Sequence, residues 1–80
     1  MKKWIVVAID VGETANGHST FCGIFNSREE AETYVKEDMT DVLNMGAMDN
    51  SNADWVKHEV WQPNCDGTDG CVWDIHEIEV

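Results

Sequence analysis

The order of apolar and polar residues predicts two strands in the first part of the chain. WIVVAI, residues 4–9, is an unbroken apolar run rich in β-branched side chains, which is typical of a central strand buried on both faces. TFCGIF, residues 20–25, predicts a second, antiparallel strand, and Gly23 within it indicates a bulge or a close approach by another element. The polar segment between them, residues 10–19, contains an Asn-Gly pair and predicts a loop.

A helix is predicted from Ser27 to Gly46. Ser27 followed by Glu30 fits a capping box, and Gly46 is a suitable stop. At 100° per residue, one side of this helix gathers the apolar residues Ala31, Tyr34, Val35, Met39, Val42 and Leu43. Asp38 falls at the edge of this stripe, where it either pairs with a polar group on the sheet or reaches solvent.

Two further strands are predicted after a weakly hydrophobic loop at residues 44–54. They are WVKHEVWQ, residues 55–62, and CVWDIHEIEV, residues 71–80. The order β-β-α-β-β predicts an α+β fold, with a four-stranded antiparallel sheet and one helix packed on one face. Eighty residues fit a single small domain spanning 1–80.

The stretch CDGTDGC, residues 65–71, is the candidate for chemistry, because a zinc ion could use Cys65 and Cys71 with His58 and His76. Zinc sites place two to four residues between paired cysteines, whereas five stand here. A calcium loop of the EF-hand type starting at Asp66 would need glycine where Cys71 stands. We therefore expect no metal and no cofactor, and we keep the four-residue zinc site as an alternative.

The register of the last two strands decides where these side chains point. If Cys65 lies opposite Cys71, then Trp61 lies opposite Ile75, and strand alternation separates the cysteines from both histidines. The same register directs Val56, Val60, Val72, Ile78 and Val80 to the helix. It leaves Trp61, Trp73 and Ile75 on the uncovered face, with Glu59 beside Glu77 and Lys57 beside Glu79. An aromatic patch rimmed by carboxylates is typical of a contact site.

Catalysis is not expected from these cysteines. Asp66, Asp69 and Asp74 adjoin the thiols and oppose thiolate formation. A disulfide between Cys65 and Cys71 is geometrically possible, but it would not persist in a reducing cytosol. The turn-forming Asp-Gly pairs predict a hairpin loop, and we expect a protein that is not an enzyme.

Charge narrows the class of partner. Sixteen Asp and Glu face five Lys and Arg, for a formal net charge of −11. No basic cluster beyond Lys2 and Lys3 is available for nucleic acid or an anionic membrane. No apolar run is long enough for a membrane span, and the N-terminal run is too short for a signal peptide, so we expect a cytoplasmic protein. The acidity either keeps the protein soluble or is directed at a basic partner.

The segments WIVVAIDV and GIFNSREEAETYV resemble a pattern found in small phage and prophage proteins, in which a Y-I-V-V strand precedes G-V-F-x-S-x-E-E-A-E-x-Y. The resemblance covers residues 4–37 and carries no catalytic residues. It implies an origin in a mobile element and an accessory role directed at a host protein.

The sequence thus predicts a non-enzymatic acidic protein that binds or inhibits a host protein with a basic surface, in the manner of a nucleic-acid mimic. The alternatives are a small metal- or ligand-binding module using Cys65 and Cys71, and a structural unit that forms a homodimer. The expected partner-binding residues are Trp61, Trp73, Ile75, Glu59, Glu77, Glu79, Glu30, Glu37 and Asp41.

Overall fold

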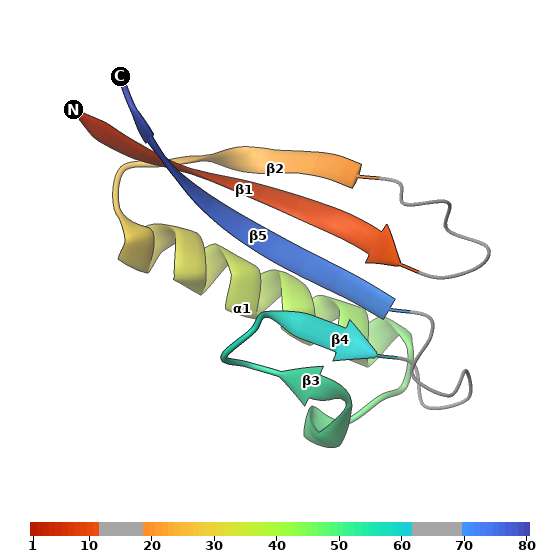
Figure 1. Ribbon diagram of the computed structural model, residues 1–80. Helices are drawn as coiled ribbons and strands as arrows, with labels where there is room; N and C mark the ends of the chain where they lie inside the picture. Colours follow the sequence, from red (N-terminus) through yellow and green to blue (C-terminus); the bar gives the residue numbers. More distant parts are fainter. Residues whose placement is uncertain (12–18, 62–69) are drawn as a thin grey trace.

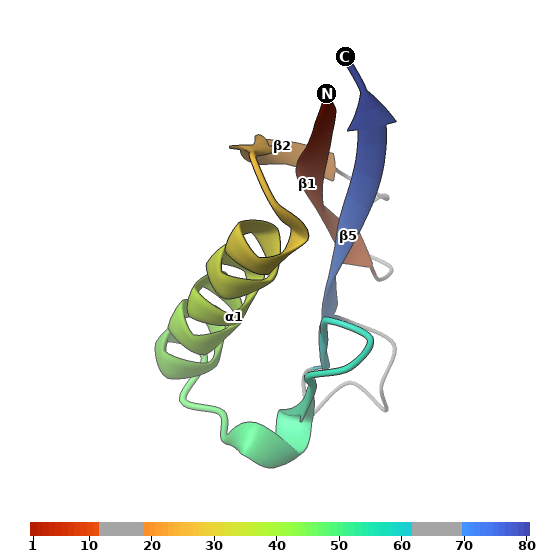
Figure 2. The same ribbon diagram turned by 90° about the vertical axis from the view of Figure 1, so that its left-hand side faces the viewer.

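One helix packs on one face of an antiparallel sheet in the computed structural model, which describes residues 1–11, 19–61 and 70–80 (Figures 1 and 2). The strand order is β2-β1-β5-β4-β3. The strands are β1 (Lys2–Val11), β2 (Ser19–Phe25), β3 (Ala53–Asp54), β4 (Glu59–Trp61) and β5 (Gly70–Glu79). The α+β class is confirmed, but the predicted count of four strands is wrong because the sheet has five.

Strand β1 is central, as its apolar run predicts. It pairs with β2 on one side and along its whole length with β5 on the other, so the first and last strands lie side by side (Figure 1). The predicted bulge in β2 is confirmed, because Val6 lies opposite Gly23 while Val7 lies opposite Phe21. Cys22 is the extra residue, and it turns toward the helix side of the sheet, where it packs against the core.

Helix α1 (Arg28–Met45) begins and ends where local signals place it. The Ser27 hydroxyl accepts a hydrogen bond from the Glu30 N–H at 3.1 Å. The Glu30 carboxylate accepts one from the Asn26 N–H at 3.2 Å, one residue before the position expected in a capping box. Gly46 is the C-cap. The helix buries Ala31, Val35, Met39 and Leu43 against the sheet.

The segment between α1 and β5 differs from its prediction. The predicted loop at 44–54 contains a short 3-10 helix, η1 (Asn50–Asn52), and β3. The predicted strand at 55–62 is reduced to β4, because the Asp54 carboxylate accepts N–H bonds from Val56 at 3.1 Å and Lys57 at 3.0 Å. These bonds hold a turn that His58 closes with a φ of 60°. The Asp54 side chain, by accepting hydrogen bonds from the backbone two and three residues later, thus replaces the start of the predicted strand with a hairpin turn.

The core lies between α1 and one face of the sheet. From the sheet it takes Val6 of β1, Val60 of β4 and Trp73 of β5, each at most 2% exposed. Trp4, Ala8, Phe25, Trp55, Cys71 and Ile75 pack around them. No helix among the described residues covers the opposite face, as the turned view makes plain (Figure 2).

Candidate functional site

Trp73 belongs to the core, so the expectation that it forms an exposed patch with Trp61 is wrong. Its side chain is 2% exposed, and its indole Nε1 donates to the Asp38 carboxylate at 2.8 Å. Asp38 therefore takes the first of its two predicted roles and pairs with a polar group on the sheet. Ile75 packs against the same core, which removes both residues from the expected partner-binding surface.

The register of β4 and β5 explains this correction. Val60 lies opposite Cys71 and Trp61 opposite Gly70, where the prediction placed His76 and Ile75. The observed partners therefore lie five positions from the predicted ones (76 − 71 = 5). A register shift by an odd number of residues moves a side chain to the other face of the sheet. Trp61 consequently lies on the face away from the helix, and Trp73 lies on the face toward it. Cys65, on which the predicted register rested, lies outside the described residues.

The same register reverses the apolar set that was assigned to the helix. Val60 does face α1, but Val72 and Ile78 lie on the opposite face of β5, because they alternate with Trp73 and Ile75. Val56 lies in the turn before β4 and is 89% exposed, and Val80 is 66% exposed.

The three helix carboxylates among the expected partner-binding residues, Glu30, Glu37 and Asp41, are all exposed. Glu30 takes part in the N-cap, whereas no ion pair joins Glu37 or Asp41 to another described residue. On the helical wheel they lie beside Tyr34, whose ring is 5.3 Å from that of Phe25 in β2. The acidic stripe, defined as Glu30, Glu37 and Asp41, therefore runs along the β2 side of the helix.

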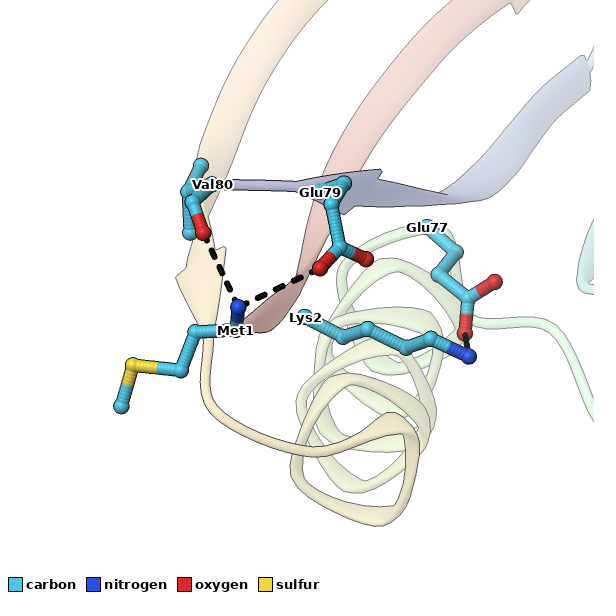
Figure 3. Close-up of polar contacts among 5 residues, drawn as sticks. All are labelled: Met1, Lys2, Glu77, Glu79 and Val80. Carbon is cyan, nitrogen blue, oxygen red and sulfur yellow. Dashed lines mark hydrogen bonds and ion pairs between the residues drawn. The ribbon is translucent and has the colours of Figure 1, made fainter.

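The other three candidate carboxylates are dispersed. Glu59 accepts a hydrogen bond from the indole Nε1 of Trp61 at 3.1 Å. Glu77 lies 3.7 Å from the Lys2 ammonium, and Glu79 lies 3.3 Å from the terminal amino group of Met1 (Figure 3). Glu77 lies opposite Trp4 rather than beside Glu59, and Glu79 lies opposite Lys2 rather than beside Lys57, so both predicted pairs are wrong.

Asp10 and Cys71 form a polar contact that the sequence did not indicate, because Asp10 was assigned to a loop. They are partners on β1 and β5, and the Cys71 thiol donates to the Asp10 carboxylate at 3.0 Å. Burial first, and then the Asp10 hydrogen bond and charge, raise the pKa of Cys71 to about 12. With Val42, Met48, Val60 and Gly70 they line a cavity of about 270 Å³. A thiol held protonated is a poor nucleophile and a poor metal ligand.

The three described residues of the zinc alternative, Cys71, His58 and His76, do not come together, and Cys65 lies outside the described residues. Cys71 faces the helix side of β5, whereas His76 lies on the other face and is 61% exposed. His58 sits in the turn before β4, where its carbonyl accepts the Trp73 N–H at 2.9 Å. Across residues 1–11, 19–61 and 70–80, no group of three or more His, Cys, Asp or Glu is placed to hold a metal ion.

An apolar surface covers the sheet face opposite α1, and the sequence prediction missed it. We define the open sheet face as the apolar residues of β2, β1 and β5 on this side, Ile5, Val7, Ile9, Phe21, Ile24, Val72 and Ile78; Trp61 of β4 lies on the same side. None of these packs against the core, and Phe21 and Ile24 are 61% and 57% exposed. The missed signal was the apolar run itself, because we assigned both faces of β1 to the interior while one helix covers only one.

Comparison with protein-family models, with curated proteins and with solved structures finds no match to this chain. Among the described residues no helix combines the length and the apolar character that crossing a membrane requires.

Proposed function

We propose that this chain is a non-enzymatic binding protein that presents the acidic stripe of α1 to a basic surface on a partner protein. The observation that carries the proposal is the pair Glu37 and Asp41, which are exposed, one turn apart and not joined by an ion pair to any described residue. Carboxylates that are not held in an ion pair keep their charge available for a partner.

The overall charge supports a basic partner. The chain carries a formal charge of −11, and two of its five cationic side chains, Lys2 and Arg28, already lie within 4.0 Å of a carboxylate. Electrostatic attraction to a basic protein would therefore act over the whole approach of the two molecules.

The spacing of the stripe supports an elongated basic groove as its target. Along the helix axis Glu30, Glu37 and Asp41 are separated by about 10 Å and about 6 Å, given a rise of about 1.5 Å per residue. A row of negative charges on a rigid rod suits a groove that binds a nucleic-acid backbone. The resemblance to small phage proteins supports a host protein as the owner of that groove, and an inhibitory effect would follow from occupying it.

Binding is better supported than catalysis by the chemistry of the described residues. The Cys71 thiol, with its pKa raised to about 12, lies against the Asp10 carboxylate, whose negative charge opposes formation of a nucleophilic thiolate. The carboxylate of Asp38 is engaged by the Trp73 indole.

The test compares two double variants that remove the same charge from different places. Each protein captures partners from a bacterial lysate at about 0.05 M and about 0.3 M NaCl, a range over which exposed charges become strongly screened. We expect the wild type and the control E77Q/E79Q to recover a basic nucleic-acid-binding protein at low salt. We expect E37Q/D41N to bind it about 10-fold more weakly.

Two results would contradict the proposal. One is recovery of no basic protein at either salt concentration. The other is equal binding by the two double variants, which would make the acidity a matter of solubility. Metal analysis of the purified protein tests the alternative module, because stoichiometric zinc would favour the site at Cys65, Cys71, His58 and His76.

A further inference from the structure

The open sheet face is an apolar surface of half-buried and exposed side chains that no described element covers. Its members come from three neighbouring strands, β2, β1 and β5, and none packs against the core cluster. Phe21 and Ile24 each leave more than half of the side chain exposed. Soluble monomers seldom leave a contiguous apolar patch of this kind without a partner.

The charge distribution distinguishes between the partners that could cover this face. Its central strand presents Ile5, Val7 and Ile9 without a charged residue between them. Charge reaches the face at its borders through Lys3 and Glu59, and within β5 through Asp74, which lies opposite Val7 and 4.0 Å from His76. A basic protein would gain little here, because the acidic stripe lies on the helix, on the other side of the sheet.

A second copy of the chain can cover this face without contacting the acidic stripe, because it presents the same apolar face. When two sheets pack face to face they lie about 10 Å apart, and the helix of each copy then lies on the outside. The two acidic stripes are thereby separated by two sheets, which exceeds the Debye length of about 8 Å at physiological salt. The acidic stripe of each copy is therefore kept away from the contact.

The size of the face is sufficient for self-association. Strands β1 and β5 are ten residues long, which corresponds to about 33 Å, and three adjacent strands span about 14 Å. The projected area is then roughly 500 Å² per copy, or about 1,000 Å² buried in total. This flat estimate leaves out the additional area of interdigitating side chains. That value lies at the lower limit for specific protein interfaces, where weak, reversible association is typical.

We propose that two copies pack through their open sheet faces about a two-fold axis, which produces a four-layer α-β-β-α dimer. The contact is isologous, so Phe21 and Ile24 of one copy cover the β1 and β5 side chains of the other. The proposal is independent of the acidic stripe, which stays accessible on both outer sides of the dimer.

Sedimentation equilibrium tests the proposal on the full chain, from about 5 to about 500 μM protein in about 0.15 M NaCl. We expect the wild type to change from monomer to dimer across this range. Phe21→Lys and Ile24→Lys should each weaken the dimer at least about 10-fold. Both lower the net negative charge, so a loss of association cannot come from added repulsion. Met45→Lys is the matched control, because Met45 is 81% exposed at the end of α1, and it should leave the equilibrium unchanged.

Val72→Thr separates face-to-face packing from edge pairing. Phe21 and Ile24 lie on β2, which is also an edge of the sheet, whereas Val72 lies on β5 between two other strands. We expect Val72→Thr to weaken the dimer as well, with circular dichroism confirming that each variant is folded. A dimer that loses affinity only through the β2 variants would replace our proposal with pairing of β2 edges. A wild type that stays monomeric at the highest concentration would overturn it.

Discussion

Asp38 and Trp73 fix which side of β5 is the inside of the molecule. The indole ring is the largest side chain in the core, and its one polar group is bonded to a helix carboxylate. A buried indole N–H without a partner is costly, so a Trp is placed inside only where an acceptor is within reach. Asp38, at the edge of the apolar stripe, supplies that acceptor, and the alternate residues of β5 are then directed outward.

Removing the acceptor should destabilise the fold. We expect Asp38→Ala to lower the free energy of unfolding by about 1–3 kcal/mol, because the Trp73 N–H would lose its partner. Asp38→Asn keeps an oxygen at the same place and should cost less. Asp41→Ala, on the exposed stripe, is the control and should stay within about 0.5 kcal/mol of the wild type. Urea unfolding followed by circular dichroism measures all three, and equal effects of Asp38→Ala and Asp41→Ala would contradict the role of the bond.

Cys71 should be slow to react because burial and Asp10 raise the pKa of its thiol to about 12, so that less thiolate forms than in the unfolded chain. In a protein that keeps only this cysteine (C22S/C65S), we expect iodoacetamide at about pH 8 to modify folded Cys71 at least about 100-fold more slowly than the urea-unfolded chain. Asp10→Asn should raise the folded rate, because it removes the charge that opposes thiolate formation.

The same raised pKa has a consequence for stability. Above the ordinary pKa of a cysteine the unfolded chain loses the Cys71 proton while the folded protein, with its pKa at about 12, retains it. The contribution of Cys71 to the free energy of unfolding is thus fully present at neutral pH and is lost as the pH rises toward 12. If iodoacetamide modified folded and unfolded Cys71 at the same rate at pH 8, the buried environment that raises its pKa would not be formed.

The pairing of β4 with β5 depends on Gly70. A Cβ atom there would lie 2.3 Å from the Val60 carbonyl oxygen and 2.7 Å from the Trp61 ring. The ring of Trp61 therefore lies over a position where only glycine fits. This close approach keeps Trp61 opposite Gly70.

Gly70→Ala should separate these two strands and lower the free energy of unfolding by about 1–3 kcal/mol. Gly23→Ala is the matched control, since its Cβ would meet only the Phe25 ring at 3.4 Å. We expect the control to change stability by less than about 1 kcal/mol. Urea unfolding of both variants is the measurement, and a stable Gly70→Ala protein would show that β4 can move without cost.

The elements that the sequence predicted correctly are those with local signals. Ser27, Gly46 and the apolar stripe lie within one segment and define α1 without reference to the rest of the chain. The register of β5 has no such local signal, because apolar residues stand on both of its faces, with Val72 and Ile78 alternating against Trp73 and Ile75. Alternation alone cannot show which of the two sets the helix covers. The predicted patch was wrong because the wrong register placed Trp73 on the same face as Trp61. The acidic stripe depended only on the helix, and its residues are exposed as predicted.

At the scale of the whole molecule, charge acts against compaction. Sixteen acidic residues face five basic ones, and the described ion pairs are at the surface. Surface ion pairs contribute little to the free energy of unfolding. Repulsion among the excess carboxylates acts over the whole fold and destabilises the compact state.

Salt should therefore stabilise the protein. We expect the urea midpoint to rise when NaCl increases from about 0.05 M to about 0.5 M, because repulsion is screened. The E37Q/D41N variant carries less negative charge and should show a smaller rise. A midpoint that falls with salt would mean that the ion pairs of Lys2 and Arg28 outweigh the repulsion.

The pairing of β1 with β5 also determines the order in which the fold can form. These two strands are the centre of the sheet, yet Lys2 lies opposite Glu79 and Val11 opposite Gly70. Contacts so distant in sequence close the largest loops and form slowly. As the chain leaves the ribosome, β1, β2 and α1 emerge before β5, and until β5 is made the edge of β1 that pairs with it stays open. The protein is therefore most exposed to chaperones, proteases and other nascent copies just before its last strand is made.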